Sequence, residues 1–141
     1  MMSRARPHER FSSTVTLTPA RASEFARAAG DENPIHHDEN YAAQTRFGRP
    51  VASGTQTTAH LMALTASHFS KTGPMVGLEF WFKFRRPVFA DETISLEWLV
   101  VQVKENARLG GDVVELRGRA RNAEGVTAVG AKGRVLLTER L

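Results

Sequence analysis

The chain has 141 residues, enough for one domain with its own hydrophobic core. It contains no cysteine, which excludes disulfides, thiolate metal sites and a cysteine nucleophile. The formal net charge of +4 is spread along the chain, so it suits an anionic small molecule or solubility alone and is too diffuse to predict nucleic-acid binding.

The N-terminal residues are rich in charge and lead into no apolar stretch, so they predict no secretory signal. No apolar run along the chain reaches the length of a membrane span. The absence of cysteine fits a reducing compartment. We therefore expect a flexible tail over residues 1–10, a single domain over residues 11–141, and a cytoplasmic protein that does not bind membranes.

The first half of the chain predicts mostly helices. A weak alternation over residues 14–17 indicates a short strand, and Thr18-Pro19 then supplies a capping hydroxyl and a proline suited to a first helical turn. Gly30 ends that helix. Two further helices are predicted, a short one over residues 39–45 with Asp38 as its cap and a long one over residues 54–69.

The long helix carries apolar residues at helical spacing, namely Ala59, Met62, Ala63, Ala66 and Phe69. Leu61 and Leu64 widen this apolar surface, so we expect the helix to be buried on most sides. The second half of the chain predicts four antiparallel strands with alternating apolar positions, from Val76 to Phe84, Ile94 to Val100, Val114 to Ala120 and Val129 to Leu137. A change of face at Val101 and Val103 indicates a bulge, and residues 122–125 predict a hairpin turn. This is an α+β layout with a helix against one face of a sheet.

The loop from Gly30 to His36 combines backbone-shaping residues with two groups that move protons. Gly30 permits a left-handed backbone, and Pro34 fixes its own φ and keeps Asn33 out of the helical region. Asp31 and His36 are a carboxylate and an imidazole, which are common acid–base catalysts near neutral pH. A plain turn would use the same Asp and Asn chemistry, so spacing alone leaves both interpretations open.

Together with the segments Phe25 to Ala43, Phe47-Gly48 and Val51-Ala52-Ser53-Gly54, this loop resembles the MaoC-like (R)-specific enoyl-CoA hydratase family. The pattern of that family is Gly-Asp-x-Asn-Pro-Leu/Ile-His with a small residue six positions after the histidine, here Ala42. The resemblance implies a hot-dog fold, in which an antiparallel sheet wraps a long central helix. It implies the addition or removal of water across an enoyl thioester of coenzyme A, with no other cofactor because coenzyme A is part of the substrate.

The resemblance also assigns roles to residues. Asp31 and His36 are the acid–base pair that holds the reacting water, with the choice of base left open, and Asn33 positions the loop or that water. The backbone N–H of Gly54 is a candidate oxyanion donor, although Gly54 is also what a helix start would use. Weaker candidates for substrate contact are Thr55 at the start of the long helix, and Arg85 and Arg86, which could bind phosphates or be ordinary surface.

Two positions depart from the family pattern, which commonly has a histidine before the glycine and a hydroxyl residue before Gly30. Ser53 and Ala29 stand there in this chain, so the acyl specificity does not follow from the resemblance. The neighbouring His37 and Asp38 invite a metal interpretation, but adjacent loop residues rarely face one ion, so we expect no metal, a solvated His37 and a capping Asp38.

Two alternative functions keep the same fold. One is an acyl-CoA thioesterase, and the other is a non-catalytic subunit of a heteromer that binds acyl thioesters. Both predict a different use of the loop, and the presence of Asp31 together with His36 argues against them. An exposed sheet edge and the aromatic strands favour a homodimer.

Overall fold

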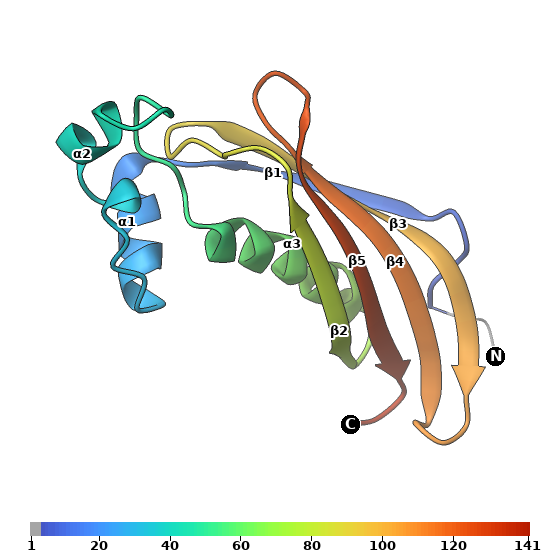
Figure 1. The fold of residues 1–141 in the computed structure, drawn as a ribbon. Helices are drawn as coiled ribbons and strands as arrows, with labels where there is room; N and C mark the ends of the chain where they lie inside the picture. Colours follow the sequence, from blue (N-terminus) through green and yellow to red (C-terminus); the bar gives the residue numbers. More distant parts are fainter. Residues whose placement is uncertain (1–3) are drawn as a thin grey trace.

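The computed structural model describes residues 4–141 and contains one antiparallel sheet with strand order β1-β3-β4-β5-β2. Figure 1 shows this sheet curving around a long helix, α3. The strands are β1 (Arg10–Thr16), β2 (Met75–Phe84), β3 (Thr93–Asn106), β4 (Gly111–Arg121) and β5 (Thr127–Thr138). The helices are α1 (Pro19–Ala28), α2 (Glu39–Ala43), α3 (Gly54–Phe69) and the short 3-10 turns η1 (Pro34–His36) and η2 (Ser70–Thr72). The predicted α+β, hot-dog architecture is confirmed.

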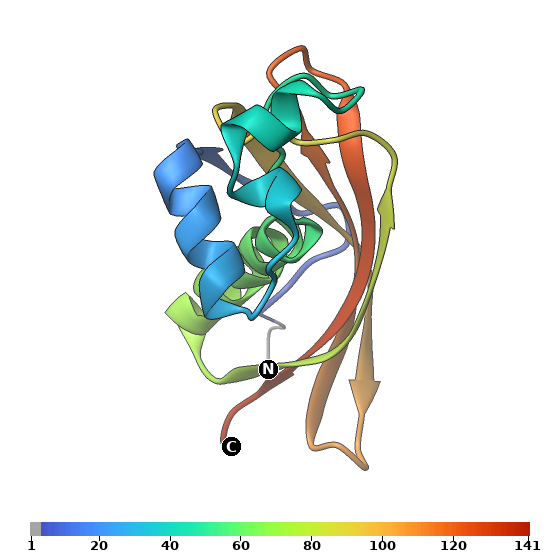
Figure 2. The same cartoon turned by 60° about the vertical axis from the view of Figure 1, so that its left-hand side comes forward.

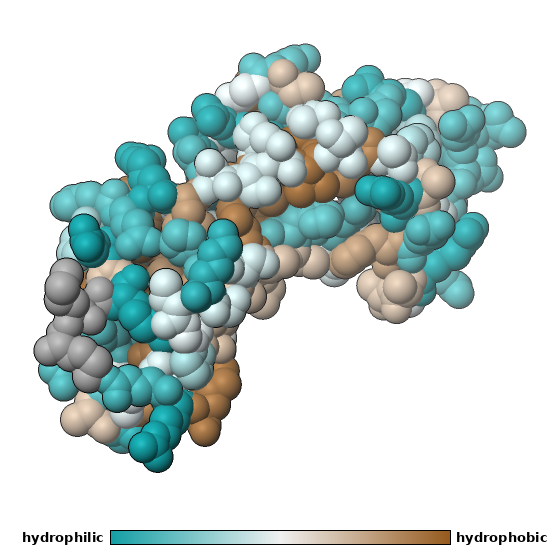
Figure 3. Space-filling view, turned by 180° about the vertical axis from the view of Figure 1, so that it is seen from behind, coloured by the Kyte–Doolittle hydropathy of each residue, from teal (hydrophilic) through white to brown (hydrophobic). Residues whose placement is uncertain are grey.

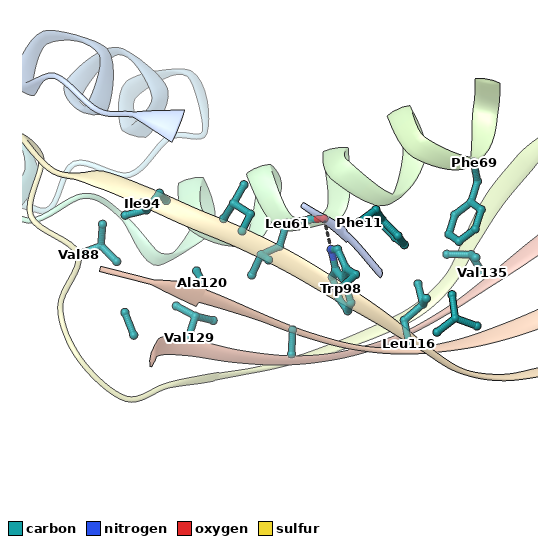
Figure 4. Close-up of a cluster of buried hydrophobic side chains, with 14 of the residues drawn as sticks. Phe11, Leu61, Phe69, Val88, Ile94, Trp98, Leu116, Ala120, Val129 and Val135 are labelled. Atoms are coloured by element: carbon teal, nitrogen blue, oxygen red, sulfur yellow. Dashed lines mark hydrogen bonds between the residues drawn. The ribbon is translucent and has the colours of Figure 1, made fainter. Parts of the chain in front are cut away.

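The core lies between α3 and the concave face of the sheet. Figure 4 shows Leu61 of α3 pointing toward Trp98 of β3, whose indole Nε1–H donates to the Leu61 carbonyl oxygen at 2.9 Å. Trp98 is only 1% exposed, so this bond satisfies a donor that would otherwise be buried without a partner. This hydrogen bond links α3 to the sheet at a fixed position.

The buried face of α3 differs from the predicted one. The buried residues are Gln56, Thr57, Leu61, Thr65 and Phe69, whereas Met62 is 41% exposed and Ala63 and Ala66 are exposed. Thr65 can be buried because its hydroxyl donates to the Met62 carbonyl oxygen at 2.7 Å. The prediction is confirmed for Leu61 and Phe69 and wrong for Met62, Ala63 and Ala66, which face away from the sheet while polar residues take part in the buried face.

The four predicted strands are present, and β3 keeps the expected alternation of buried and partly buried residues from Ile94 to Val100. The bulge predicted near Val101 is confirmed by a shift between Val100 and Gln102 in the β3–β4 pairing. A second shift, between Gly77 and Glu79, breaks the alternation of β2. Of the apolar residues predicted to share one buried face of β2, the central phenylalanines are partly buried, and the exposed ones are Val76, Leu78 and Phe84.

Figure 2 shows the three helices on the same side of the sheet, and Figure 1 shows α1 and α2 at one end of α3. The predicted caps are confirmed: the side chain of Thr18 accepts from Arg21 N–H, and that of Asp38 accepts from Tyr41 N–H. The helix α2 ends at Ala43, earlier than expected. In the view from behind, hydrophobic residues reach the surface along the concave side of the molecule (Figure 3).

The expected flexible tail over residues 1–10 needs correction. Residues 1–3 lie outside the described part of the chain, and residues 4–10 pack on the domain. The Arg4 guanidinium donates to the carbonyl oxygens of Phe69, Pro74 and Thr138 at 2.7–2.8 Å. Composition alone could not predict these hydrogen bonds of Arg4, because their acceptors are backbone atoms distant in sequence. Within residues 4–141, no helix is both long and apolar enough to cross a membrane.

Candidate active site

The loop that leaves α1 carries the predicted catalytic residues, and backbone bonds fix its path. Gly30 adopts φ +82°, the left-handed region that glycine enters without steric cost. The Asp31 N–H then donates to the Ala26 carbonyl oxygen at 2.7 Å, which ties the loop to the last turn of α1. The loop therefore starts from a rigid helix end, and Asp31 has a defined position.

The Asp31 carboxylate is held by its own loop. Its Oδ1 accepts from Asn33 N–H at 3.0 Å, and Oδ2 lies 3.2 Å from Nε2 of His36. Asn33 in turn caps η1, since its Oδ1 accepts from Ile35 N–H at 3.3 Å. Of the two roles considered for Asn33, these contacts favour that of positioning the loop.

The tautomer of His36 follows from its second contact. Nδ1 lies 2.6 Å from the Val51 carbonyl oxygen, which can only accept, so Nδ1 carries a hydrogen. A neutral His36 then has its lone pair at Nε2, facing a carboxylate that also offers only acceptors. The contact with Asp31 is favourable only when one partner carries a proton, so the two side chains are suited to share and exchange one proton.

Burial of the pair is unequal. The His36 side chain is 9% exposed, and that of Asp31 is 33% exposed. His36 also lines a cavity of about 460 Å³, to which Gly54, Arg85 and Arg86 contribute. The remaining wall is mostly apolar and consists of Arg46, Phe47, Val51, Ala52, Thr57, Phe84, Pro87, Val88 and Val129. The imidazole of His36 thus lines a space large enough for a small molecule.

Gly54 begins α3 at this cavity. A Cβ at this position would lie 2.8 Å from Cε1 of Phe84, so the ring packs where a side chain would otherwise stand. Its N–H is among the first of the helix, which have no intrahelical acceptor, and among residues 4–141 no hydrogen bond engages it. This donor, with the positive end of the helix dipole behind it, belongs to a residue that lines the cavity.

The three predicted substrate contacts have different outcomes. Arg85 and Arg86 line the cavity, and both backbone N–H groups donate to the Ala128 carbonyl oxygen at 2.8 and 3.2 Å. Thr55 is absent from the cavity wall and exposed, and its hydroxyl donates to Oγ of Ser53. The threonine that does line the cavity is Thr57.

Sequence reasoning missed several cavity residues. Arg46 and Phe47 belong to the wall, and the Arg46 guanidinium carbon lies 5.3 Å from the centre of the Phe47 ring. The motif gave no signal for Arg46, since it lies on a connecting segment whose path depends on tertiary contacts. The hydrogen bond from His36 to the Val51 carbonyl oxygen also could not be predicted from residue types.

The two departures from the family pattern have structural roles. Ser53 is 1% exposed and caps α3, where its side chain accepts from Gln56 N–H. Ala29 is the exposed C-cap of α1. Neither lines the cavity. Among residues 4–141 there is no group of three or more His, Asp or Glu side chains placed to hold a metal ion.

His60 lies on α3, one turn beyond Gln56. Its Nε2 is 3.4 Å from Nε2 of Gln56, and its ring centre is 6.4 Å from that of Phe25. Burial lowers the pKa of His60 below its ordinary value of 6.5, because a charged imidazole would lose hydration there. Burial therefore favours the neutral form of His60, which lies on the side of α3 that meets α1.

Comparison with known proteins places this geometry in context. The model of the MaoC like domain family matches residues 4–120. The chain is 33% identical over 104 residues to a 3-hydroxybutyryl-CoA dehydratase of Methylorubrum extorquens, and the match covers 68% of this chain and 66% of the relative. It is 29% identical over 87 residues to an (R)-specific enoyl-CoA hydratase of Aeromonas caviae, covering 62% and 64%. These matches span just under two thirds of each relative.

Among solved structures, the fold is similar to that of an (R)-hydratase from A. caviae involved in PHA biosynthesis. The TM-score is 0.86 at 24% sequence identity, and the match covers 94% of this chain and 97% of the other. At that identity the likeness supports the fold alone.

Proposed function

Because the chain belongs to the MaoC like domain family, a family of hydratases and dehydratases, we propose that it adds or removes water across the 2,3 double bond of an enoyl-CoA thioester. The observation that carries this proposal is the Asp31–His36 pair, in which His36 lines the same cavity as Gly54. Relatives named as a 3-hydroxybutyryl-CoA dehydratase and an (R)-specific enoyl-CoA hydratase support it, and we include (R) stereochemistry in the proposal.

The proposed reaction uses one water molecule and one proton-exchanging pair. The pair removes a proton from the water, whose oxygen bonds to C3 of the substrate. The electrons of the double bond move toward the thioester, whose oxygen becomes an enolate. The pair then returns the proton to C2, so that the 3-hydroxyacyl thioester contains all atoms of the water. General acid–base assistance of this kind is worth about two to four orders of magnitude in rate.

The enolate oxygen needs a hydrogen-bond donor of its own, separate from the acid–base pair. The Gly54 N–H is suited to this role, because it has no acceptor among the described residues and lies at a helix N-terminus. Removal of one such donor typically costs about two to three orders of magnitude in kcat. Dehydration is the same path reversed.

The arginines of the cavity wall suit the phosphates of coenzyme A. Arg46, Arg85 and Arg86 contribute to its wall, and guanidinium groups offer paired donors that match phosphate oxygens. The apolar part of the wall, which includes Val88 and Val129, would take the acyl group. The substrate would therefore enter with its charge at the arginines and its enoyl group toward His36.

We further propose that the protein forms a homodimer through β2. This strand stands at the edge of the sheet and exposes large apolar side chains, with Leu78 at 41% and Trp81 at 51%. Exposed apolar edges of this kind are protected in stable proteins, and pairing with a second copy achieves this. Light scattering should give twice the chain mass, and Leu78→Lys should reduce it to one chain.

The test of the activity is hydration of crotonyl-CoA by the wild type, Asp31→Asn and His36→Ala. We expect loss of the enoyl absorbance with the wild type and a fall of at least about a hundredfold in each variant. Chiral analysis of the product should give the (R) isomer. Unchanged rates in both variants would exclude the pair as catalysts, and release of free coenzyme A would indicate a thioesterase instead.

A further inference from the structure

His37 follows the proposed catalytic histidine directly, and the structure holds it between α1 and the loop. Its Nδ1 lies 2.6 Å from Oγ of Ser23, and its Nε2 lies 2.8 Å from the backbone carbonyl oxygen of Asp31. The side chain is partly buried, so the expectation of a solvated His37 is wrong. Both ring nitrogens are engaged, one by a helix and the other by the residue that carries the carboxylate.

The direction of both hydrogen bonds follows from the acceptors. A carbonyl oxygen cannot donate, so the Nε2–H of His37 donates to Asp31. In the neutral ring Nδ1 then has no hydrogen and accepts from the Ser23 hydroxyl. The two neighbouring histidines therefore take opposite tautomers, since His36 carries its hydrogen on Nδ1 for the Val51 carbonyl. The Asp31 carbonyl fixes the tautomer of His37, and the Ser23 hydroxyl donates to the remaining Nδ1 and so holds the ring in its orientation.

With this bond, three of the four polar groups of Asp31 are fixed. Its N–H donates to Ala26, its carbonyl oxygen accepts from His37, and its Oδ1 accepts from Asn33 N–H. Only Oδ2 is left to meet Nε2 of His36. Because the peptide groups on both sides of the Asp31 Cα are held, the carboxylate has little freedom to turn away.

We propose that His37, oriented by Ser23, is a positioning residue that keeps the Asp31 carboxylate in place against His36. This inference rests on the proposed function for its effect on catalysis, but its geometric content is independent of the substrate. His37 does not line the cavity, so it acts through Asp31 and not by contact with the ligand.

The test compares four variants of the full chain on crotonyl-CoA. His37→Leu removes the donor to Asp31, and we expect kcat to fall about tenfold or more with KM changed less than about twofold. His37→Gln places an amide N–H near the position of Nε2, and we expect it to keep most of the wild-type kcat. Ser23→Ala leaves the donor but frees the ring, and we expect an intermediate loss.

His68→Leu is the matched control. His68 is also a partly buried, hydrogen-bonded histidine, with Nε2 2.6 Å from Oε2 of Glu9, but it lies at the far end of α3. We expect this variant to lower the melting temperature while kcat stays at the wild-type value. A loss of kcat in His68→Leu equal to that in His37→Leu would indicate general destabilisation and overturn the positioning role.

A second readout works without any substrate. The ¹⁵N chemical shift of Nε2 in His36 reports its contact with the Asp31 carboxylate. We expect this shift to change in His37→Leu, and to stay at the wild-type value in His37→Gln and His68→Leu. An unchanged shift in His37→Leu overturns the inference, even for a protein without hydratase activity. An inactive wild type with the expected shifts would contradict the proposed function and leave the positioning role supported.

Discussion

Replacing Gly54 with alanine puts a methyl group between the start of α3 and the ring of Phe84. The new Cβ would lie 2.8 Å from Cε1 and 3.0 Å from Cζ of that ring. Carbon atoms in contact prefer about 3.5–4.0 Å, so the ring has to move by about 1 Å. Phe84 is 57% exposed, and it is the tip of its side chain that meets the methyl group, so solvent offers room for this movement.

The cost in stability should therefore be small. Alanine gains up to about 1 kcal/mol over glycine in a helix, because it restricts the unfolded chain. Partial loss of packing by a half-exposed ring offsets a gain of that size. We expect the free energy of unfolding of Gly54→Ala to stay within about 1 kcal/mol of the wild type.

Activity should change much more than stability. The methyl group and the displaced ring both intrude beside the Gly54 N–H, which is the proposed donor to the enolate oxygen. Loss of one such donor costs about a hundredfold in kcat, so we expect Gly54→Ala to lose that much with KM nearly unchanged.

The assay is crotonyl-CoA hydration, together with denaturant unfolding, on Gly54→Ala, Phe84→Ala and the double variant. If the methyl group itself blocks the donor, the double variant stays as slow as Gly54→Ala. If only the displaced ring matters, removing it restores the rate, and Gly54 is merely a helix-start glycine. A wild-type rate in Gly54→Ala would refute the donor role, and destabilisation above about 3 kcal/mol would refute the packing argument.

Three further predictions follow from other contacts. Burial lowers the pKa of His60 in the folded state, so the unfolded chain takes up a proton first as the pH falls below 6.5. The free energy of unfolding should therefore decrease below that pH. Urea unfolding at successive pH values should show a smaller decrease for His60→Gln than for the wild type. Replacing Arg85 and Arg86 with serine should raise KM for crotonyl-CoA about five- to tenfold but leave KM for a thioester without phosphates unchanged; equal effects on both substrates would contradict phosphate binding. Trp98→Phe removes the donor to the Leu61 carbonyl and should lower the free energy of unfolding by about 1–3 kcal/mol, whereas a change below about 0.5 kcal/mol in urea unfolding would show that the bond does not hold α3 to the sheet.

Features that depend on neighbouring residues in the chain were predictable from sequence. The bounds of α3, the caps at Thr18 and Asp38 and the bulge near Val101 all follow from local side-chain chemistry. The loop geometry belongs to the same class, because Gly30, Asn33 and Pro34 fix their own backbone. The approach of Asp31 to His36 was expected for this reason, and the structure places them 3.2 Å apart.

Features set by distant contacts could not be predicted in this way. The buried face of α3 depends on which threonines bond to their own helix, as Thr65 does. The hydrogen bonds of Arg4, and the hydrogen bond from His36 to Val51, use backbone carbonyl oxygens whose positions only the folded chain defines. His37 was predicted to be solvated because its hydrogen-bond partner, Ser23, lies on a separate element, α1. Residue types indicated the chemistry, and tertiary contacts decided which groups carry it.

The most direct measurement of the central claim is the kcat of the double variant Asp31→Asn/His36→Ala relative to the two single variants. Two side chains that share one proton and act on the same water form a unit, so removing the second should cost little once the first is gone. We predict that the double variant hydrates crotonyl-CoA no more slowly than the slower single variant, within about threefold. If each single variant loses about a hundredfold in kcat and the double variant loses about ten-thousandfold, Asp31 and His36 act independently, which would contradict the account.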